Sequence, residues 1–306
     1  MMNGRYLVIP GDLAGVGPEL LPRCWEAGAL SGERFAVAGP SDWLNSLPEA
    51  FRAEVQSFAV ATVAGCPIPG EPDGRSARQA MDTLAWAAGQ CREGTFRGLV
   101  TGPICKETMV REGFAFPGQT EFLANAWKGE PSMAFWGEEL RVVLATWHIP
   151  LASVPSALTP EVLTRAVERA FRLAQKVSPE DPSVAVCGLN PHAGENGLLG
   201  VEEKEWIGPC LQELTKRVSG LDPVPQPADT LFWRARQGWP KVVVALYHDQ
   251  GLAPLKTVEF NTSCQVTLGL PHARTSPDHG TAFGIAGQGK ADPGSFRKAL
   301  ETIQCF

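Results

Sequence analysis

The stretch Val242–Gly251, VVVALYHDQG, is an apolar and largely β-branched run that ends abruptly in polar residues. Such a run predicts a buried strand, and the polar residues after it predict a loop at the carboxyl end of that strand. The same arrangement recurs along the chain. We expect strands at Tyr6–Ile9, Arg34–Ala38, Gly98–Thr101, Val142–Thr146, Ser183–Cys187 and Val242–Tyr247.

Longer stretches with the helical spacing of apolar residues alternate with these strands. We expect helices at Arg75–Cys91, Pro160–Val177 and Glu203–Val218. In the second of these, Thr159 can cap the first turn, and Pro160 sits where its missing amide hydrogen costs nothing. Strands that alternate with helices predict α/β layers around a largely parallel sheet, so the predicted fold class is α/β.

Composition and charge limit the possible partners. The chain has 306 residues, of which 44% are hydrophobic, so it is long enough for two packed domains. A net charge of −6 without a Lys/Arg cluster argues against nucleic-acid binding, and any charge that binds an anionic substrate must be local. We find neither a signal peptide nor an apolar stretch of the roughly 20 residues that span a bilayer. We therefore expect a cytoplasmic protein without a membrane partner.

The eight cysteines include no Cys-x-x-Cys pair, which argues against a zinc finger or a thioredoxin-like redox site. Cys187 and Cys264 lie in apolar runs, and we expect both to be small buried hydrophobic residues. Reduced thiols are typical of the cytosol.

Three of the five histidines follow predicted strands: His148, His192 and His248. In open α/β sheets the carboxyl ends of the strands form the edge where ligands bind. Three imidazoles at one edge suggest a divalent metal site, for which zinc, cobalt, manganese and magnesium are candidates. The alternative is that each histidine simply hydrogen-bonds a loop backbone, and the spacing alone leaves both open.

Other polar residues follow strands in the same way. Lys106 comes after Gly98–Thr101, and the turn Gly11–Pro18 could face an anion with free N–H groups, although it lacks the full dinucleotide motif and its glycines could serve packing alone. The segment Leu268–Pro293 is rich in glycine and shows little strand or helix pattern. It is suited to close approach of its backbone to a ligand; the alternative is a plain surface crossover.

Several long motifs resemble the 4-hydroxythreonine-4-phosphate dehydrogenase family, in the family's order and over most of the chain. They are LVTGPICK (99–106), FPGQTEFLA (116–124), GLNPHAGENGLLGVEE (188–203), ADTLF (228–232), YHDQGLAPLK (247–256) and TLGLPHARTSPDHGTAFGIAGQGKAD (267–292). The block HGTAFGIAGQGKADP (279–293) also resembles the glycine-rich cofactor loop of isopropylmalate and isocitrate dehydrogenases.

The resemblance implies an isopropylmalate/isocitrate dehydrogenase-like fold: two α/β/α domains with the active site in the cleft between them. We expect a discontinuous first domain, 1–115 plus 275–306, and a second domain, 116–274. The resemblance also implies a homodimer whose metal site is shared across the interface.

Matched by motif, His148, His192 and His248 are the implied metal ligands. The implied substrate-binding residues are Gln119, Thr120, Lys256, Gln265 and Arg274, and those implied to bind NAD or NADP are His279, Gly280, Thr281, Ala282, Gly287 and Asp292. The general base is open among Lys106, Asp229 and Asp249, because all three lie in motif segments. Either aspartate could instead orient a metal-bound histidine.

The implied reaction is NAD-dependent, divalent-metal-dependent oxidation of 4-phosphooxy-L-threonine with decarboxylation to 3-amino-2-oxopropyl phosphate, in pyridoxine and pyridoxal phosphate biosynthesis. Alternatives are a paralogous dehydrogenase of threonate or erythronate 4-phosphate or of a dihydrodiol acid, and a catalytically silent ligand-binding protein. Three departures from the family concern the substrate: Gln119 replaces the usual His, Gln265 replaces Asn, and Leu13 replaces Pro.

Overall fold

The computed structural model describes residues 4–306 and divides the chain into two compact units. Unit 1 comprises Met1–Pro131 and Cys264–Phe306, and unit 2 comprises Ser132–Ser263. The first unit is therefore made of two separate segments of the chain, divided from the second unit between 131 and 132 and between 263 and 264. A boundary at 115/116 would detach α6, whose Trp127 donates from Nε1 to the Ala88 carbonyl of α4 at 2.9 Å, and one at 274/275 would cut strand β10.

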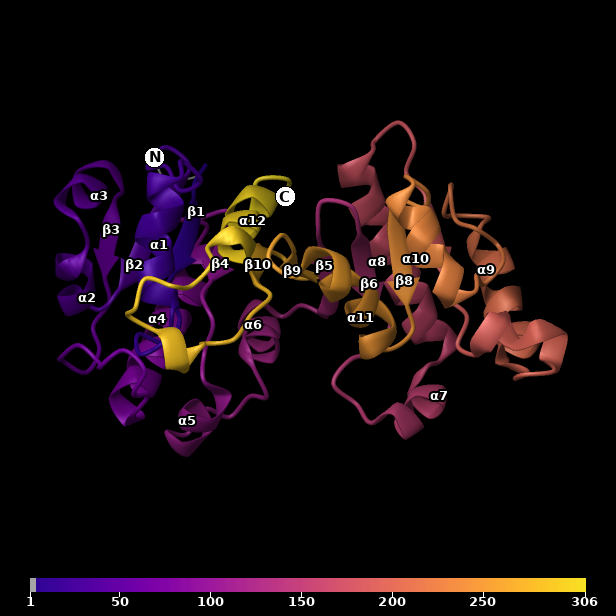
Figure 1. Ribbon diagram of the computed structural model, residues 1–306, viewed down its shortest axis with the longest axis horizontal. Coiled ribbons are helices and arrows are strands. Elements are labelled where there is room, and N and C mark those ends of the chain that lie inside the picture. The colour runs from indigo at the N-terminus through magenta and orange to yellow at the C-terminus, as the bar shows by residue number, and fades with distance from the viewer. Residues whose placement is uncertain (1–3) are drawn as a thin grey trace. The chain divides into compact units, whose positions relative to one another are not determined.

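Unit 1 is built on a six-stranded part of the sheet (Figure 1). The strand order is β3 (Ser57–Ala59), β2 (Phe35–Gly39), β1 (Tyr6–Ile9), β4 (Gly98–Thr101), β10 (Ala273–Pro277) and β9 (Cys264–Leu268). Every neighbouring pair of strands is parallel except the pair β9–β10, which is antiparallel. The helices are α1 (Gly17–Glu26), α2 (Ser41–Ser46), α3 (Glu49–Glu54), α4 (Gly74–Arg92), α5 (Lys106–Arg111), α6 (Gln119–Trp127) and α12 (Gly294–Ile303).

Helices cover both faces of this part of the sheet. Alternation along a strand sends neighbouring side chains to opposite faces. Leu7 and Leu99 are fully buried in one cluster with Leu84 of α4. On β10, Thr275 donates from Oγ1 to the carbonyl of Ala299 in α12 at 2.8 Å, so α12 covers a face of this strand. Unit 1 therefore has the three layers of an α/β/α domain.

Unit 2 holds four strands in the order β5 (Ser132–Trp136), β6 (Arg141–Leu144), β8 (Val242–Ala245) and β7 (Val184–Val186). Only β5 and β6 pair antiparallel. The α-helices are α7 (Val154–Ala157), α8 (Pro160–Val177), α9 (Gly208–Leu214), α10 (Ala228–Arg236) and α11 (His248–Glu259). One sheet face packs on α10 and α11 through a cluster that includes Val243, Leu231 and Leu255, and α8 contacts β6, β7 and β8.

Helix α8 has its predicted bounds and shows why the sequence specified it. Thr159 caps it by accepting a hydrogen bond from the Val162 amide at 3.3 Å. Its apolar stripe is buried, and full burial of one Leu side chain such as Leu163 stabilises the fold by about 2 kcal/mol. Cys187 and Cys264 are completely buried, as predicted. Within residues 4–306, no helix is both long and apolar enough to cross a membrane.

Two predicted elements were wrong in detail. The segment Leu268–Pro293, predicted to lack regular structure, contains all of strand β10, whose buried residues are mostly polar and so gave no apolar signal. The predicted helix Glu203–Val218 is interrupted: a π-helical turn, Glu203–Ile207, precedes α9. Pro209 has no amide hydrogen for the regular helical bond, which agrees with a break at this point.

Candidate active site

Arg274 is a buried cation in unit 1, only 4% exposed on β10. Its Nε and Nη2 donate to Thr101 Oγ1 at 3.2 and 2.8 Å, and its Nη1 donates to Thr267 Oγ1 at 3.1 Å and to Gln265 Oε1. Burial lowers the pKa of the guanidinium to about 10, so it stays charged at neutral pH. A buried charge whose hydrogen bonds go to neutral acceptors favours an anionic ligand.

The first turn of α6 adds two more of the predicted residues to this cluster. Thr120 Oγ1 accepts from Arg274 Nη1 at 3.4 Å. Gln119, 8% exposed, donates from Nε2 to the Gly102 carbonyl at 3.0 Å. That bond fixes the orientation of the Gln119 amide. In the flipped orientation Oε1 of Gln119 would face the carbonyl oxygen of Gly102, and neither atom can donate. Gln119 Oε1 is then a buried acceptor without a hydrogen-bond partner among the described residues.

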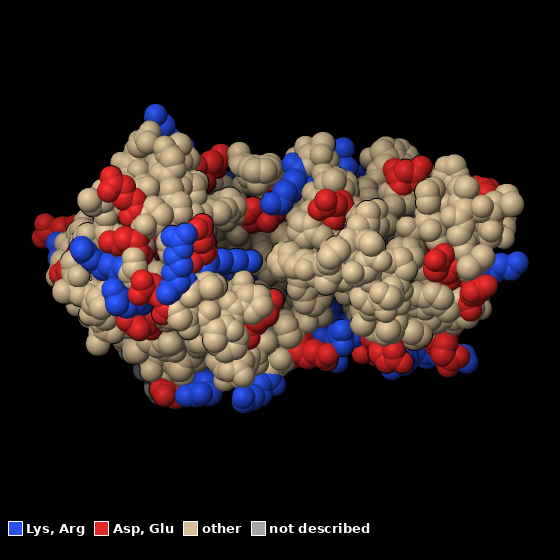
Figure 2. Space-filling view, turned by 90° about the horizontal axis from the view of Figure 1, so that it is seen from below, with Lys and Arg blue, Asp and Glu red and all other residues tan. Residues whose placement is uncertain are grey.

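Lys106 lies beside the same turn. A Cβ atom added to Gly118, the residue before α6, would be 3.6 Å from Lys106 Nζ and 3.2 Å from Glu121 Oε2. The structure thus gathers Lys106, Gln119, Thr120, Gln265 and Arg274 around the ends of β4 and β10, whereas Lys256 belongs to unit 2. Figure 2 shows basic and acidic side chains interspersed over one face.

His148 and His248 come together in unit 2. They follow the neighbouring parallel strands β6 and β8, and their ring centroids lie 5.6 Å apart. The Nδ1 atom of His248 is 2.7 Å from Asp249 Oδ1, a contact that can orient the imidazole. Both histidines and Asp249 line a pocket of about 260 Å³, with Leu151 and Tyr247 among its apolar walls. Two imidazoles beside a carboxylate suit a divalent transition metal.

His192 lies in a different pocket of unit 2. It belongs to the 3₁₀ segment Pro191–Gly197, its Nδ1 is 3.0 Å from Glu195 Oε2, and it lines a pocket of about 610 Å³. Among residues 4–306, no three His, Cys, Asp or Glu side chains lie close enough to hold a metal ion. The structure therefore brings together two of the three predicted ligands and leaves His192 apart.

The backbone around His192 is strained. His192, Ala193, Glu195 and Asn196 all have φ between 43° and 55°, in the left-handed region, which costs a non-glycine residue of order 1 kcal/mol or more. The buried Glu203 side chain braces the start of this segment, because its Oε1 accepts from the Asn190 amide at 2.7 Å.

The two candidate aspartates differ in setting. Asp249 contacts His248, as an orienting residue would. Asp229 is exposed in the first turn of α10, in the same unit.

The glycine-rich loop between β10 and α12 holds all the predicted cofactor-binding residues. It rests on the turn between β1 and α1, where the Val16 amide donates to the Thr281 carbonyl at 3.0 Å. The approach is close enough that a Cβ atom on Gly15 would lie 2.9 Å from that carbonyl oxygen. His279 and Thr281 are half-buried, while Gly280, Ala282, Gly287 and Asp292 are exposed. The loop thus offers backbone to a ligand.

Some functional positions escaped sequence reasoning. Thr101 and Thr267 supply the acceptors that fix Arg274, and the available signal was that each lies within one of the motifs shared with the family. Asp12, by contrast, lies in the turn Gly11–Pro18 that the sequence did single out. It is fully buried, and burial raises the pKa of its carboxyl group although Oδ1 accepts from the Ala14 amide at 3.0 Å.

Comparison with known proteins decides the family. A family model described as "Pyridoxal phosphate biosynthetic protein PdxA" matches residues 32–303. The chain belongs to the PdxA family. A relative named 4-hydroxythreonine-4-phosphate dehydrogenase, from Xanthobacter autotrophicus, is 40% identical over 324 residues, which cover 95% of this chain and 90% of the relative.

Comparison with solved structures shows which folds the chain resembles. The structure of 4-hydroxythreonine-4-phosphate dehydrogenase from Klebsiella pneumoniae has a TM-score of 0.84 at 33% identity, with 98% of each chain covered. Isocitrate dehydrogenase from Methylococcus capsulatus, at 16% identity, has a TM-score of 0.53 and covers 98% of this chain and 84% of its own. The predicted kinship of PdxA and isocitrate dehydrogenase folds is thereby confirmed.

Proposed function

We propose that this PdxA-family chain oxidises 4-phosphooxy-L-threonine with NAD and decarboxylates the product to 3-amino-2-oxopropyl phosphate. The observation that carries the proposal is the Arg274 cluster. A guanidinium held by Thr101, Thr267 and Gln265 is prepared for an oxyanion before any ligand arrives. The relatives named for this reaction share nearly the whole chain.

Each residue around Arg274 would make a different contact with the anionic group of the substrate. Arg274 supplies the fixed charge, Thr120 a hydroxyl, and the first turn of α6 free backbone amides, which together suit a phosphate or carboxylate group. Lys106 has a flexible stem next to Gly118, so its amine can reach a group bound there. Lys256, on α11, is proposed as a further substrate-binding cation.

A divalent metal is part of the proposal. His148 and His248 would hold it, and Asp249 would keep the His248 ring oriented. Such an ion supplies Lewis acidity, which favours ionisation of the substrate alcohol and stabilises the negative charge that develops as carbon dioxide leaves. Zinc, cobalt, manganese and magnesium are the candidate ions, and imidazole donors favour the transition metals over magnesium, which prefers oxygen ligands.

We further propose a homodimer whose metal site takes ligands from both copies. The placement of His192 in a pocket separate from His148 and His248 agrees with this arrangement. Proton transfer from the substrate hydroxyl is assigned to Lys106, which lies beside the first turn of α6 and would act in its neutral form, since Asp249 is engaged with His248. NAD or NADP would bind along the glycine-rich loop, which explains why the usual dinucleotide motif is missing.

A second candidate follows from Gln119 and Gln265. Both lie in the Arg274 cluster, and both differ from the residue usual in the family, so a phosphorylated sugar acid, threonate or erythronate 4-phosphate, is the competing substrate.

The eight thiols are free and five of them are buried or have a raised pKa from burial, which agrees with a reducing cytoplasm.

The test is steady-state NADH formation with equal concentrations of 4-phosphooxy-L-threonine, the two sugar-acid phosphates and a dihydrodiol acid. The proposal requires the highest kcat/KM for 4-phosphooxy-L-threonine. A higher value for a sugar acid would assign the paralogous activity, and no turnover of any compound, with or without added divalent metal, would indicate a silent binding protein.

A further inference from the structure

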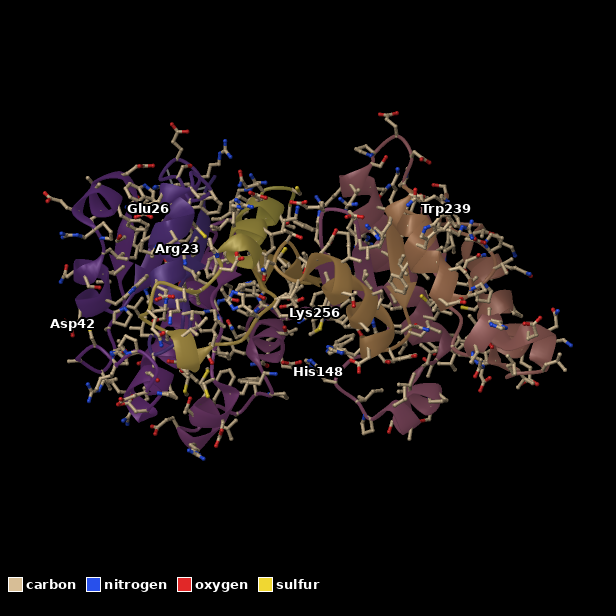
Figure 3. The ribbon with its side chains drawn as sticks, viewed as in Figure 1. Arg23, Glu26, Asp42, His148, Trp239 and Lys256 are labelled. Atoms are coloured by element: carbon tan, nitrogen blue, oxygen red, sulfur yellow. The ribbon has the colours of Figure 1, made fainter. Side chains whose placement is uncertain are left out.

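The far end of the glycine-rich loop is tied to one face of helix α1. Glu19 Oε2 accepts a hydrogen bond from the Gly289 amide at 3.2 Å. Arg23 Nη1 donates to the Gly289 carbonyl at 3.4 Å and to the Ala291 carbonyl. Glu19 and Arg23 are four residues apart, so they lie one above the other on the same face of the helix. In Figure 3, Arg23 is labelled between α1 and the yellow loop.

Helix α1 is a rigid platform for this contact. Leu20, Leu21 and Cys24, interleaved with Glu19 and Arg23, are completely buried. The start of the helix also touches the loop, through the hydrogen bond from the Val16 amide to the Thr281 carbonyl. The loop is therefore held at its beginning and at its end by the same core-packed segment of chain.

The loop needs such support because its own structure is sparse. Between β10 and α12 it contains only the short 3₁₀ turn Phe283–Ile285. Ala282, Gly287 and Gly289 have φ values of 46°, 73° and 66°, in the left-handed region. Glycines lose more backbone entropy than other residues when they are ordered. If the binding conformation is populated only part of the time, the apparent affinity for a ligand falls by that fraction.

We propose that Glu19 and Arg23 are positioning residues that hold Gly289–Ala291 in the conformation that binds the dinucleotide. The inference rests on the proposed function, because it takes the loop to be the cofactor site, and it assigns a role to two residues outside the set predicted to bind the cofactor. Neither residue needs to touch the nucleotide.

The chemistry of the contact makes Arg23 the dominant partner. A charged donor makes hydrogen bonds about twice as strong as a neutral one, and Arg23 reaches two carbonyls from one nitrogen. Lysine at this position would keep the charge on a more strongly hydrated ammonium group, so it should preserve part of the effect. Glu19 holds the single amide of Gly289, and a smaller effect is expected there.

The experiment compares Arg23→Ala, Arg23→Lys and Glu19→Ala with wild type. Glu26→Ala is the matched control, because Glu26 is exposed on the same helix. The Kd for NADH is measured by its fluorescence, and hydrogen exchange of a peptide covering 287–291 is measured without nucleotide. Loss of two charge-assisted bonds should weaken NADH binding about three- to tenfold in Arg23→Ala and speed exchange in the peptide. Arg23→Lys should be intermediate, and Glu26→Ala should match wild type.

Steady-state kinetics distinguish a positioning role of Arg23 from a general loss of folded structure. Arg23→Ala should raise KM for NAD while kcat and the KM for substrate stay within about twofold of wild type. If wild type binds NADH but Arg23→Ala binds it equally well, the inference is overturned and the proposed function stands. Faster exchange with unchanged affinity also overturns it. If wild type binds neither NADH nor NADPH, the proposed function itself fails and the inference falls with it.

Discussion

Thr101 Oγ1 accepts two hydrogen bonds from Arg274, although the residues are separated by 173 positions in the chain. The contact joins the carboxyl end of β4 to the neighbouring strand β10, with which β4 pairs in parallel. The sheet thus converts two distant motifs into one anion site. The direction of the guanidinium is set by this pairing before a substrate binds.

Replacing Arg274 by Lys should damage catalysis although the charge is retained. The ammonium cannot hold Thr101 and Thr267 while presenting a planar fork to an oxyanion. We expect kcat/KM for the phosphorylated substrate to fall about 10- to 100-fold, equivalent to roughly 1.5–3 kcal/mol. The control is Arg297→Lys, since Arg297 is exposed on α12 of the same unit. Wild-type kinetics in Arg274→Lys would place this residue outside the substrate site.

Removing the metal should abolish NAD reduction. Protein treated with a strong chelator should lose turnover and regain it with a divalent ion. His148→Ala and His248→Ala should each lower the metal content found by elemental analysis, because a methyl group cannot replace a coordinating nitrogen. Full turnover after verified metal removal would disprove the metal proposal.

His192→Ala tests the shared site separately. If a second copy supplies His192, this variant should also lose metal, and the loss should be restored in mixed dimers that pair it with a His248→Ala chain. Mixed dimers without regained metal would show that the ligands come from one copy. Both variants keep the Arg274 cluster, so binding of a phosphorylated inhibitor serves as the control for folding.

Asp12 should make stability fall as pH rises. Burial raises the pKa of its carboxyl group in the folded state, so the folded chain binds more protons than the unfolded chain between the two pKa values. The free energy of unfolding should then decrease as pH rises from about 4, the ordinary pKa of aspartate, through the folded pKa. Asn at this position keeps the acceptor for the Ala14 amide but does not ionise.

The measurement is urea unfolding of wild type and Asp12→Asn across this pH range. Glu259 has its pKa raised by burial in the same direction, but it is present in both proteins, so their difference isolates Asp12. The stability advantage of the variant should grow with pH. A difference independent of pH would mean that Asp12 does not titrate abnormally.

The sequence predicted individual helices and strands better than it predicted the contacts between them. The strands at Tyr6–Ile9 and Gly98–Thr101 have their predicted bounds because apolar runs bordered by turns leave little choice. Strand β10 was missed because Arg274, Thr275 and Ser276 are polar yet buried, and their partners come from other elements, among them strand β9 and helix α12. The composition of a segment does not indicate which distant residues it will contact. For the same reason, the hydrogen bonds from Glu19 and Arg23 to the glycine-rich loop were not predicted.

The last prediction concerns Gln119, where the family usually has histidine. In this chain the amide is committed to the Gly102 carbonyl through Nε2, and Oε1 is a buried acceptor without a partner among the described residues. The glutamine amide stays neutral at every accessible pH, whereas a histidine side chain carries a positive charge near or below its ordinary pKa of about 6.5 and can then donate to an anion. Gln119→His should therefore lower KM for the phosphorylated substrate at mildly acidic pH, by about five- to tenfold for a gain of roughly 1 kcal/mol, with little change at alkaline pH. The measurement is KM from acid to alkaline pH for wild type, Gln119→His and Gln119→Leu, which has a similar size but makes no hydrogen bond. If Gln119→His has the same KM profile as wild type, residue 119 does not reach the phosphate, and its departure from the family says nothing about the substrate.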